Sequence, residues 1–337
     1  MRRVTINDVA RLAGVSIKSV SRVVNDEPNI RPALRLKVEE AIEALGYKPN
    51  PAARSLAAGR SFAIGVLFDN PSPSYTMKVQ EGAYAACHRA GYQLVIEHVH
   101  TAGPDVAGVM AAMLANRRLD GMVVTPPATD RAVVLDALEQ YRTRYIRIAP
   151  NSFPGRSPSI SSNDGEAVGQ AVRHLWGLGH RRFGLIDGPP AHGASQWRRQ
   201  GYVSALERQG LAEAEILCAD GDFTFASGIR AGRLLLAANP RPTAIFAAND
   251  DMAAGLFAAA AQMGIGIPDG LSVVGFDNSW IATTLWPELT TLHQPIAEMA
   301  FDAVEMLIAS KSEGDSPAAR LQDCELVIRG STAQTSP

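Results

Sequence analysis

The chain has 337 residues, of which 46% are hydrophobic, and its formal net charge is −2. The three cysteines (Cys87, Cys218 and Cys324) are odd in number and far apart, which excludes a disulfide framework and a thiolate metal site and fits a reducing cytoplasm. Charge is unevenly distributed: residues 1–60 carry +5 and the remainder −7, so only the first segment suits a polyanion.

The N-terminal sequence does not have the pattern of a signal peptide, because Met1, Arg2 and Arg3 lead into a capped helix rather than an apolar run. The most apolar later stretch, residues 253–261, is too short to cross a bilayer. We therefore expect a soluble cytoplasmic protein with no membrane partner.

Residues 5–25 have the pattern of two short helices joined by a tight turn. Thr5 and Asp8 are spaced as a capping box, and apolar residues follow at helical spacing. Gly14 can take the left-handed conformation that ends a helix, and Ser16 supplies an oxygen for the next N-terminus. The pattern predicts a helix-turn-helix whose second helix lies in the major groove of DNA.

In that second helix Val20, Val23 and Val24 are expected to face inward. The side chains expected to point outward are Ile17, Lys18, Ser21 and Arg22. A third helix begins near Pro32 and ends at Gly46, which gives three helices around one small core.

Residues 49–60 form an Ala-rich segment that can fold into about two helical turns, capped by Asn50 and begun by Pro51. Isolated helices shorter than roughly 12 to 15 residues are marginal in water, so this hinge helix is a candidate order–disorder switch. Its one large apolar side chain, Leu56, is a candidate wedge between base steps in the minor groove. A flexible linker is the alternative interpretation.

The segments TINDVARLAGVSIKSVSRVVN and NPAARSLA, in this order and place, resemble the lactose-repressor (LacI/GalR) family of bacterial transcription regulators. Later segments such as GHRRFGLIDGP, FAANDDMAAGL and VVGFDN extend the resemblance over essentially the whole chain. It implies a homodimer that reads two half-sites of a near-palindromic double-stranded operator, with paired hinge helices in the minor groove. The residues expected to contact DNA are Thr5, Ser16, Ile17, Lys18, Ser21, Arg22, Asn25, Ala53 and Leu56.

After Arg60 the pattern changes to short β-rich runs that alternate with amphipathic segments. The runs lie at residues 63–68, 93–99, 121–125, 145–149, 182–187, 243–248 and 271–276. They predict βαβ units with parallel sheets, and a body of this size exceeds one core, so two α/β lobes are expected. The expected fold is an all-α helix-turn-helix domain followed by a two-lobed, type I periplasmic-binding-protein-like α/β domain.

The expected domain boundaries follow from these elements and from the resemblance. They are 1–49 for the DNA-binding domain, 50–60 for the hinge helix, 61–162 with 293–320 for the N-terminal lobe, 163–292 with 321–331 for the C-terminal lobe, and 332–337 for a tail.

Ligands bind beyond the carboxyl ends of the strands in such sheets, so polar and aromatic residues there are the candidate effector-binding residues. They are Asp69, Tyr75, Thr125, Arg198, Phe223, Asn249 and Asp277. By resemblance, Arg198, Asn249 and Asp277 hydrogen-bond the effector, and the ring of Phe223 flanks it. A carboxylate, an amide and a guanidinium offer acceptors and donors for hydroxyls, and a ring covers the apolar face of a sugar.

Two positions depart from common family members. The second helix begins with Ile17 and Lys18, so no known half-site can be transferred. Ala149 and Pro150 replace an acidic residue that is frequent in sugar-responsive members. The resemblance implies a repressor of a carbohydrate-utilisation operon released by a sugar or glycoside, with no cofactor; a nucleobase-like corepressor is the alternative effector.

Three other classes of protein fit the sequence less well. An enzyme is disfavoured because His180, His192 and Ser195 lack a nucleophile elbow, a Walker loop or a paired-histidine metal spacing. A non-regulatory sugar-binding protein needs an export signal and has no use for residues 1–60. An architectural DNA protein has no use for the polar strand ends.

Overall fold

The computed structural model describes residues 4–24, 29–47, 60–116, 118–309 and 319–335. The chain divides into two units, Met1–Ser61 and Phe62–Pro337, and each has its own hydrophobic core. The hinge helix expected over residues 50–60 lies outside the described residues except for Arg60.

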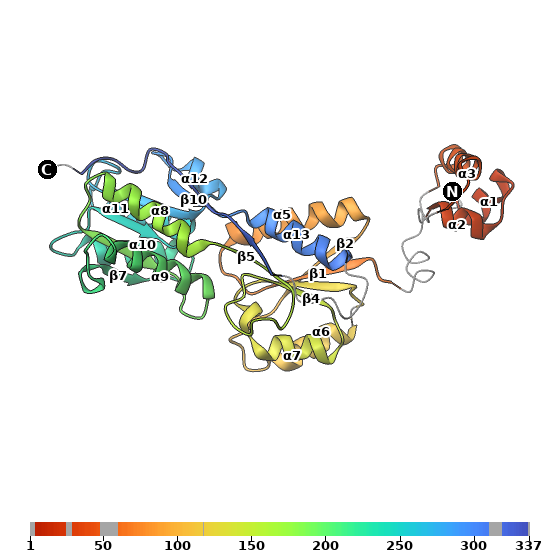
Figure 1. Cartoon of the computed structure of the whole chain (residues 1–337), viewed down its shortest axis with the longest axis horizontal. Coiled ribbons are helices and arrows are strands. Elements are labelled where there is room, and N and C mark those ends of the chain that lie inside the picture. The colour runs from red at the N-terminus through yellow and green to blue at the C-terminus, as the bar shows by residue number, and fades with distance from the viewer. Residues whose placement is uncertain (1–3, 25–28, 48–59, 117, 310–318, 336–337) are drawn as a thin grey trace. The chain divides into compact units, whose positions relative to one another are not determined.

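In the first unit the described residues form the helices α1 (Ile6–Ala13), α2 (Ile17–Val24) and α3 (Pro32–Leu45). One valine from each helix, Val9, Val20 and Val38, is fully buried in their common core. Figure 1 shows the three helices. Helices α1 and α3 end at Gly14 and Gly46, both in the left-handed conformation, as the sequence predicts.

The second unit contains two six-stranded sheets. The first sheet has the order β11-β5-β4-β3-β1-β2, with every neighbouring pair parallel. Its strands are β1 (Ala63–Phe68), β2 (Gln93–His98), β3 (Gly121–Val124), β4 (Tyr145–Ile148), β5 (Ser159–Ser162) and β11 (Ala319–Gln322). The first lobe is therefore closed by a strand from near the C-terminus.

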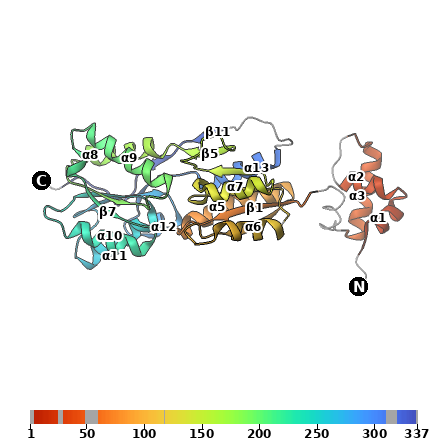
Figure 2. The same cartoon turned by 90° about the horizontal axis from the view of Figure 1, so that it is seen from below.

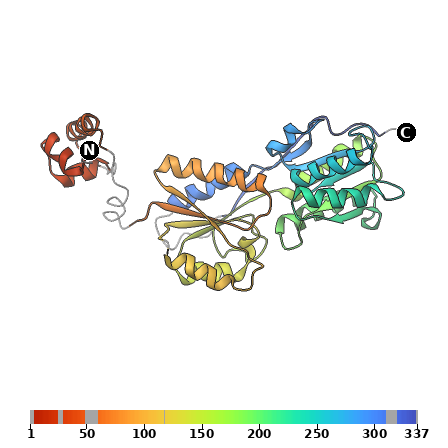
Figure 3. The same cartoon turned by 180° about the vertical axis from the view of Figure 1, so that it is seen from behind.

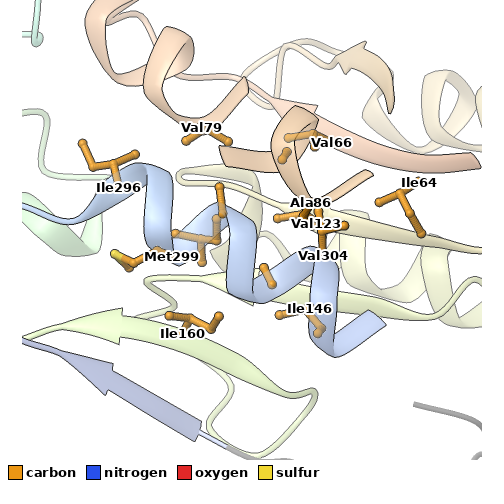
Figure 4. Packing of buried hydrophobic residues seen from close by; sticks show 14 of the residues in the cluster. Ile64, Val66, Val79, Ala86, Val123, Ile146, Ile160, Ile296, Met299 and Val304 are labelled. Carbon is orange, nitrogen blue, oxygen red and sulfur yellow. The ribbon is translucent and has the colours of Figure 1, made fainter. Parts of the chain in front are cut away.

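Four helices cover this sheet. They are α5 (Pro73–Ala90) and α13 (Ile296–Ala309) on one face, and α6 (Val106–Asn116) and α7 (Ala132–Gln140) on the other, with a short turn η1 (Ala128–Asp130) before α7. The orange α5 and the blue α13 lie side by side from both viewpoints (Figures 1 and 3). Figure 4 shows Val79 of α5 and Ile296, Met299 and Val304 of α13 over the sheet residues, among them Ile146.

The α5–α13 contact is very close at one glycine. A Cβ atom on Gly82 would lie 1.8 Å from the carbonyl oxygen of Ala297, a separation that no side chain can tolerate. The absence of a side chain at Gly82 therefore sets how closely the two helices approach.

The second sheet has the order β12-β10-β9-β8-β6-β7, and all its pairs are parallel except the antiparallel pair of β10 and β12. Its strands are β6 (Phe183–Asp187), β7 (Leu217–Asp220), β8 (Ala244–Ala247), β9 (Ser272–Asp277), β10 (Thr290–His293) and β12 (Glu325–Val327). The helices are α8 (Asp164–Gly177) and α9 (Gly193–Glu207) on one face, α10 (Phe225–Leu236) and α11 (Asp250–Gln262) on the other, and the short η2 (Glu213–Glu215) and α12 (Trp280–Thr284). Figure 2 shows the two helix pairs on opposite sides of the sheet.

The chain passes between the lobes three times, between β5 and α8, between β10 and α13, and between β11 and β12. The three connections are hydrogen-bonded to one another. The side chain of Asn163 donates to Asp323 (2.9 Å) and accepts from the Cys324 amide (2.7 Å). Gln294 in the second connection donates to the Ser162 hydroxyl beside the first (2.7 Å).

Two expected boundaries differ from this geometry. The boundary after residue 320 falls inside β11, which pairs with β5 along its whole length. Residues expected to form a tail are hydrogen-bonded to the second lobe: the amide of Thr335 donates to the carbonyl of Leu178 (3.0 Å), and His180 bonds the carbonyl of Ala333 (3.1 Å).

The fold class matches the expectation from the sequence, with a helical domain preceding a two-lobed α/β domain. All seven β-rich runs are strands, whereas β5, β7, β10, β11 and β12 were not anticipated.

Candidate functional site

The helix-turn-helix of the first unit is set by short local hydrogen bonds. The amide and the hydroxyl of Thr5 both donate to the Asp8 carboxylate (3.0 and 2.7 Å), which fixes the start of α1. Gly14 then turns the chain with φ +65°, and the hydroxyl of Ser16 accepts the amide of Ser19 (3.1 Å) at the start of α2. The turn predicted from the sequence is thus present.

The outer face of α2 carries the side chains predicted to read DNA. Ile17 has 51% of its surface exposed, and Lys18 beside it is also exposed. Ser21 and Arg22, expected to point outward, are only half-buried rather than exposed. Thr5 and Ser16 are exposed at the two helix starts. The remaining predicted DNA contacts, Asn25, Ala53 and Leu56, lie outside the described residues.

A small cavity lies between the two lobes of the second unit, at the carboxyl ends of the strands, and its volume is about 30 Å³. Its lining comes from both lobes and from the connection after β10. The residues are Asn70, Ser72, Tyr75, Pro126, Ala149, His192, Ala194, Arg198, Phe223, Asn249, Asp277 and Gln294. We call it the interlobe cavity.

Arg198 on α9 is the central cation of the interlobe cavity. Its guanidinium donates to Asp164 (2.8 Å), to the Ala248 carbonyl (2.6 Å) and, from the third nitrogen, to Gln294 (3.2 Å). Asp277 lies 3.7 Å from the same third nitrogen. Burial alone would lower the pKa of Arg198, but the Asp164 and Asp277 carboxylates outweigh it and raise that pKa. The guanidinium is therefore charged, and each of its three nitrogens donates one hydrogen bond.

Asp277, at the end of β9, supplies a buried acceptor that the protein does not use. Its Oδ1 atom is buried and accepts no hydrogen bond within the described residues. Burial raises the pKa of Asp277 well above its ordinary value, and Arg198 opposes that rise. Tyr75 on α5, also buried, has a hydroxyl with no partner in the described structure. A ligand with hydroxyl groups can satisfy both, because a buried unpaired polar atom is costly.

Two rings form a corner of the cavity. Phe223 has φ +65°, and its ring meets the ring of His192 edge to face, with centroids 5.2 Å apart and an interplanar angle of 80°. Burial lowers the pKa of His192 to about 4, so this imidazole is neutral at pH 7. Asn249 donates to the Phe223 carbonyl (3.1 Å) and accepts from the Met252 amide (3.0 Å). In this geometry Asn249 orients Phe223 and caps α11.

The structure brings five of the seven predicted effector residues to the interlobe cavity: Tyr75, Arg198, Phe223, Asn249 and Asp277. The other two are bonded locally. Asp69 accepts both the amide and the hydroxyl of Thr101, and Thr125 donates its hydroxyl to the Leu67 carbonyl (2.7 Å). Neither Asp69 nor Thr125 lines the cavity.

Several lining residues were missed by sequence reasoning. Gln294 follows β10, a strand that the sequence did not reveal, and Ser72 caps α5 rather than ending a strand. His192, which the sequence suggests only as a candidate catalytic residue in the disfavoured enzyme interpretation, also lies in the lining. Ala149, already noted as a departure from the family, lies in the lining.

Two negative findings bear on function. In the part of the chain that the structure describes, no cluster of three or more His, Cys, Asp or Glu side chains is arranged to bind a metal ion. None of the described helices is both long and apolar enough to span a bilayer.

The chain has a helix-turn-helix unit followed by a two-lobed α/β body with a polar interlobe cavity. This combination is typical of DNA-binding regulators that carry an effector-binding domain. Residues 5–50 match the model of bacterial regulatory proteins of the lacI family, and residues 172–332 match the model of a periplasmic binding protein-like domain. The chain belongs to the lacI family of bacterial regulatory proteins, as the resemblance in its sequence implies.

Relatives over nearly the full length support this assignment. The chain is 35% identical to the transcriptional repressor PurR of Edwardsiella ictaluri, over 92% of each chain. It is 33% identical to the ribose operon repressor of Escherichia coli, over 97% of this chain and 99% of that one. Catabolite control protein A of Priestia megaterium is 31% identical over 90% of this chain and 91% of its own.

Solved structures agree with the sequence relatives. The Lac repressor dimer bound to operator and an anti-inducer aligns with a TM-score of 0.79 and 26% identity, over 98% of this chain and 100% of that chain. The complex of the transcriptional regulator CelR with cellobiose gives a TM-score of 0.73 and 27% identity over the same shares. The chain is thus a transcriptional repressor with a DNA-binding and an effector-binding domain, and not an enzyme.

Proposed function

We propose that this repressor acts in the cytoplasm as a homodimer on a near-palindromic operator, and that a sugar or glycoside in the interlobe cavity releases it. The ribose operon repressor and the cellobiose complex of CelR support a carbohydrate effector. Effector couplings of about 1 to 3 kcal/mol are typical, which corresponds to roughly 5- to 150-fold in operator affinity.

The observation that carries this proposal is the unpaired polar chemistry of the cavity. The free Oδ1 of Asp277 accepts a hydroxyl, and the hydroxyl of Tyr75 can donate or accept. The ring of Phe223 covers the apolar face of a sugar beside them.

The charge of the cavity favours an uncharged effector. Among the lining residues Arg198 is the one charged basic group, and Asp164 and Asp277 already balance it. His192 is neutral at pH 7 because burial lowers its pKa to about 4. A phosphate ester or a carboxylate would therefore find no free cation in the cavity to pair with.

The small size of the cavity implies that effector binding is coupled to movement of the residues that line it. About 30 Å³ holds little more than one water molecule, whereas ligand pockets are usually several hundred Å³. An effector must therefore displace groups of both lobes, such as Tyr75 on one side and Arg198 on the other. A ligand that binds one arrangement of the lobes better shifts the protein toward it.

A nucleobase is the second candidate effector. It is favoured by one observation, that the rings of both Tyr75 and Phe223 line the cavity and can face a flat heterocycle.

On the DNA side, we propose that Ile17 and Lys18 read base edges in the major groove. Lys18 can donate to guanine, and Ile17 can contact a thymine methyl. The hinge helix with Leu56 is proposed to enter the minor groove between the half-sites, as the sequence predicts.

A ligand screen tests the proposal. Thermal shift measurements on the full chain against ribose, cellobiose, other mono- and disaccharides and the purine bases identify the effector class, because a ligand that binds the native state raises its stability. Mobility shifts with fragments upstream of its own gene and of neighbouring genes then measure operator affinity with and without the stabilising compound.

The matched variants are Asp277→Ala and Asp269→Ala, the second at an exposed loop position of the same lobe. We expect Asp277→Ala to bind the operator but lose the response to the compound, and Asp269→Ala to behave as wild type. An Asp277→Ala protein that still responds would show that the effector binds elsewhere.

A further inference from the structure

The first half of α5 is one part of the first lobe that contacts the second lobe. The hydroxyls of Ser72 and Ser74 donate to the two oxygens of Asp251 at the start of α11 (2.9 and 3.3 Å). One helical turn later, the ammonium of Lys78 donates to the carbonyls of Asp277 (3.0 Å) and Asn278 (2.9 Å). Lys78 therefore binds the backbone of the same residue whose Oδ1 atom accepts no hydrogen bond within the described residues.

The backbone that Lys78 holds is in a sparsely populated conformation. Asp277 has φ +102° and Asn278 has φ +48°, although neither is glycine. Two consecutive residues of this kind persist only where the surroundings over-determine them, and such strain gathers at ligand sites. The contacts around this turn are therefore the ones that aim the Asp277 side chain.

The second lobe also holds this turn. Asp277 pairs with His293 in the β9–β10 ladder, and a guanidinium nitrogen of Arg198 lies 3.7 Å from the Asp277 carboxylate. The guanidinium of Arg329 donates to the Asn278 side chain (2.7 Å), and the amide of Ser279 donates to Asp250 (2.6 Å). The amide of Asn278 donates to the hydroxyl of Thr291 (3.4 Å). Lys78, by contrast, is a donor from the opposite lobe.

We propose that Lys78 is a positioning residue for the effector site: from the first lobe it holds the backbone of Asp277 and Asn278, and so aims the Asp277 carboxylate into the cavity. The inference rests on the proposed function in that it takes Asp277 as the effector's acceptor. It adds that the orientation of the Asp277 carboxylate depends on a contact between the two lobes.

This arrangement gives the effector a route to the first lobe. A ligand that pulls on the Asp277 carboxylate moves the peptide to which Lys78 is bonded, and thus moves α5. Because α5 packs directly on α13 at Gly82, the displacement is shared by both helices on that face of the first sheet. The link is a pair of hydrogen bonds between the two lobes.

Hydrogen exchange followed by mass spectrometry tests the role of Lys78 on the full chain, with no effector added. The amides of Asn278 and Ser279 are hydrogen-bonded in the turn, so their exchange reports how firmly it is held. We expect Lys78→Met to speed exchange of a peptide spanning residues 276–281 by about tenfold or more, and Lys78→Arg, which keeps a donor, to restore most of the protection.

Arg89→Met is the matched control. Arg89 is a cation on the same helix, but its partner is Glu305 within the first lobe (2.6 Å). We expect it to leave exchange in the turn unchanged. A peptide spanning β6 serves as the internal reference for global unfolding, and should Lys78→Met loosen the whole fold, Lys78→Gln is compared with Lys78→Arg in the same peptide.

Exchange in the turn within twofold of wild type in both Lys78→Met and Lys78→Gln would overturn the proposal, as would equal acceleration in Arg89→Met. Unchanged hydrogen exchange in the turn would contradict the role of Lys78 but would say nothing against effector binding in the cavity. An unchanged effector response in Asp277→Ala removes the proposed cavity chemistry and leaves the exchange result standing. The two failures are therefore distinguishable.

Discussion

Replacing Arg198 by methionine removes the buried cation that joins four groups of the second unit. Methionine keeps the apolar stem but loses the bonds to Asp164 (2.8 Å), to the Ala248 carbonyl (2.6 Å) and to Gln294 (3.2 Å). The side chains of Asp164 and Asp277 are 1% and 4% exposed, so both carboxylates lose their cation in a dry environment. Removing one partner of a buried ion pair costs about 3 to 5 kcal/mol, and we expect a loss of that size.

Urea unfolding of the full chain measures this loss. All four tryptophans lie between residues 176 and 286, so their fluorescence reports on the second unit alone. Arg199→Met is the matched control: Arg199 is the next residue on α9, and its guanidinium pairs with Asp187 and Glu213 while its side chain is 38% exposed. Exposed pairs contribute about 0.2 to 1 kcal/mol, so the control should differ little from wild type.

A double-mutant cycle with Asp164→Asn separates the ion pair from other effects. Because Arg198 and Asp164 are direct partners (2.8 Å), the double variant should be less destabilised than the sum of the two single losses, by about 2 kcal/mol. Losses that simply add, or an Arg198→Met protein within 1 kcal/mol of wild type, would refute the view that this buried network holds the cavity.

Three further outcomes are expected. Changing Lys18 to alanine should alter base preference at one position of each half-site, by about 1 to 3 kcal/mol, in binding to randomised operators; uniform weakening would show a phosphate contact only. Gly82→Ala should destabilise the chain by about 3 kcal/mol in thermal unfolding, because its methyl meets the Ala297 carbonyl, whereas Gly177→Ala, with open space around it, should cost nothing. His192 has a folded pKa of about 4 against an ordinary 6.5, so its stabilisation is present above pH 6.5 and is lost as pH falls toward 4, by about 3 kcal/mol relative to His192→Gln; parallel stability curves would argue against a buried neutral imidazole.

The sequence predicts the apolar strands of this fold better than the polar ones. The strand β1 is buried at every position, and β8 likewise, so each reads as an unbroken apolar run. The strands β7 and β11 end their sheets and expose most of their residues, and β5 reads as Ser-Ile-Ser-Ser. An edge strand buries too little for hydrophobicity to reveal it.

The candidate site was predictable where a polar residue directly follows a recognised buried strand, as Asn249 and Asp277 do. The same rule also selected Asp69 and Thr125, whose hydrogen-bonding capacity is used by neighbouring segments. Position in the chain indicates the correct edge of the sheet, but it does not tell whether a side chain is already bonded there. Lys78 could not have been found this way, since its partners are backbone carbonyls of the other lobe.

The interleaved path of the chain has a consequence for its synthesis. Ala319 pairs with Ser159, so the outermost strand of the first sheet is made only after the whole second sheet except β12. During synthesis the first sheet therefore stays incomplete, and β5 is an unpaired edge strand, while more than a hundred later residues leave the ribosome. Pairings of such long sequence separation form slowly, so we expect closure of this sheet to be the late step of folding, and the nascent chain to be most prone to aggregation just before it.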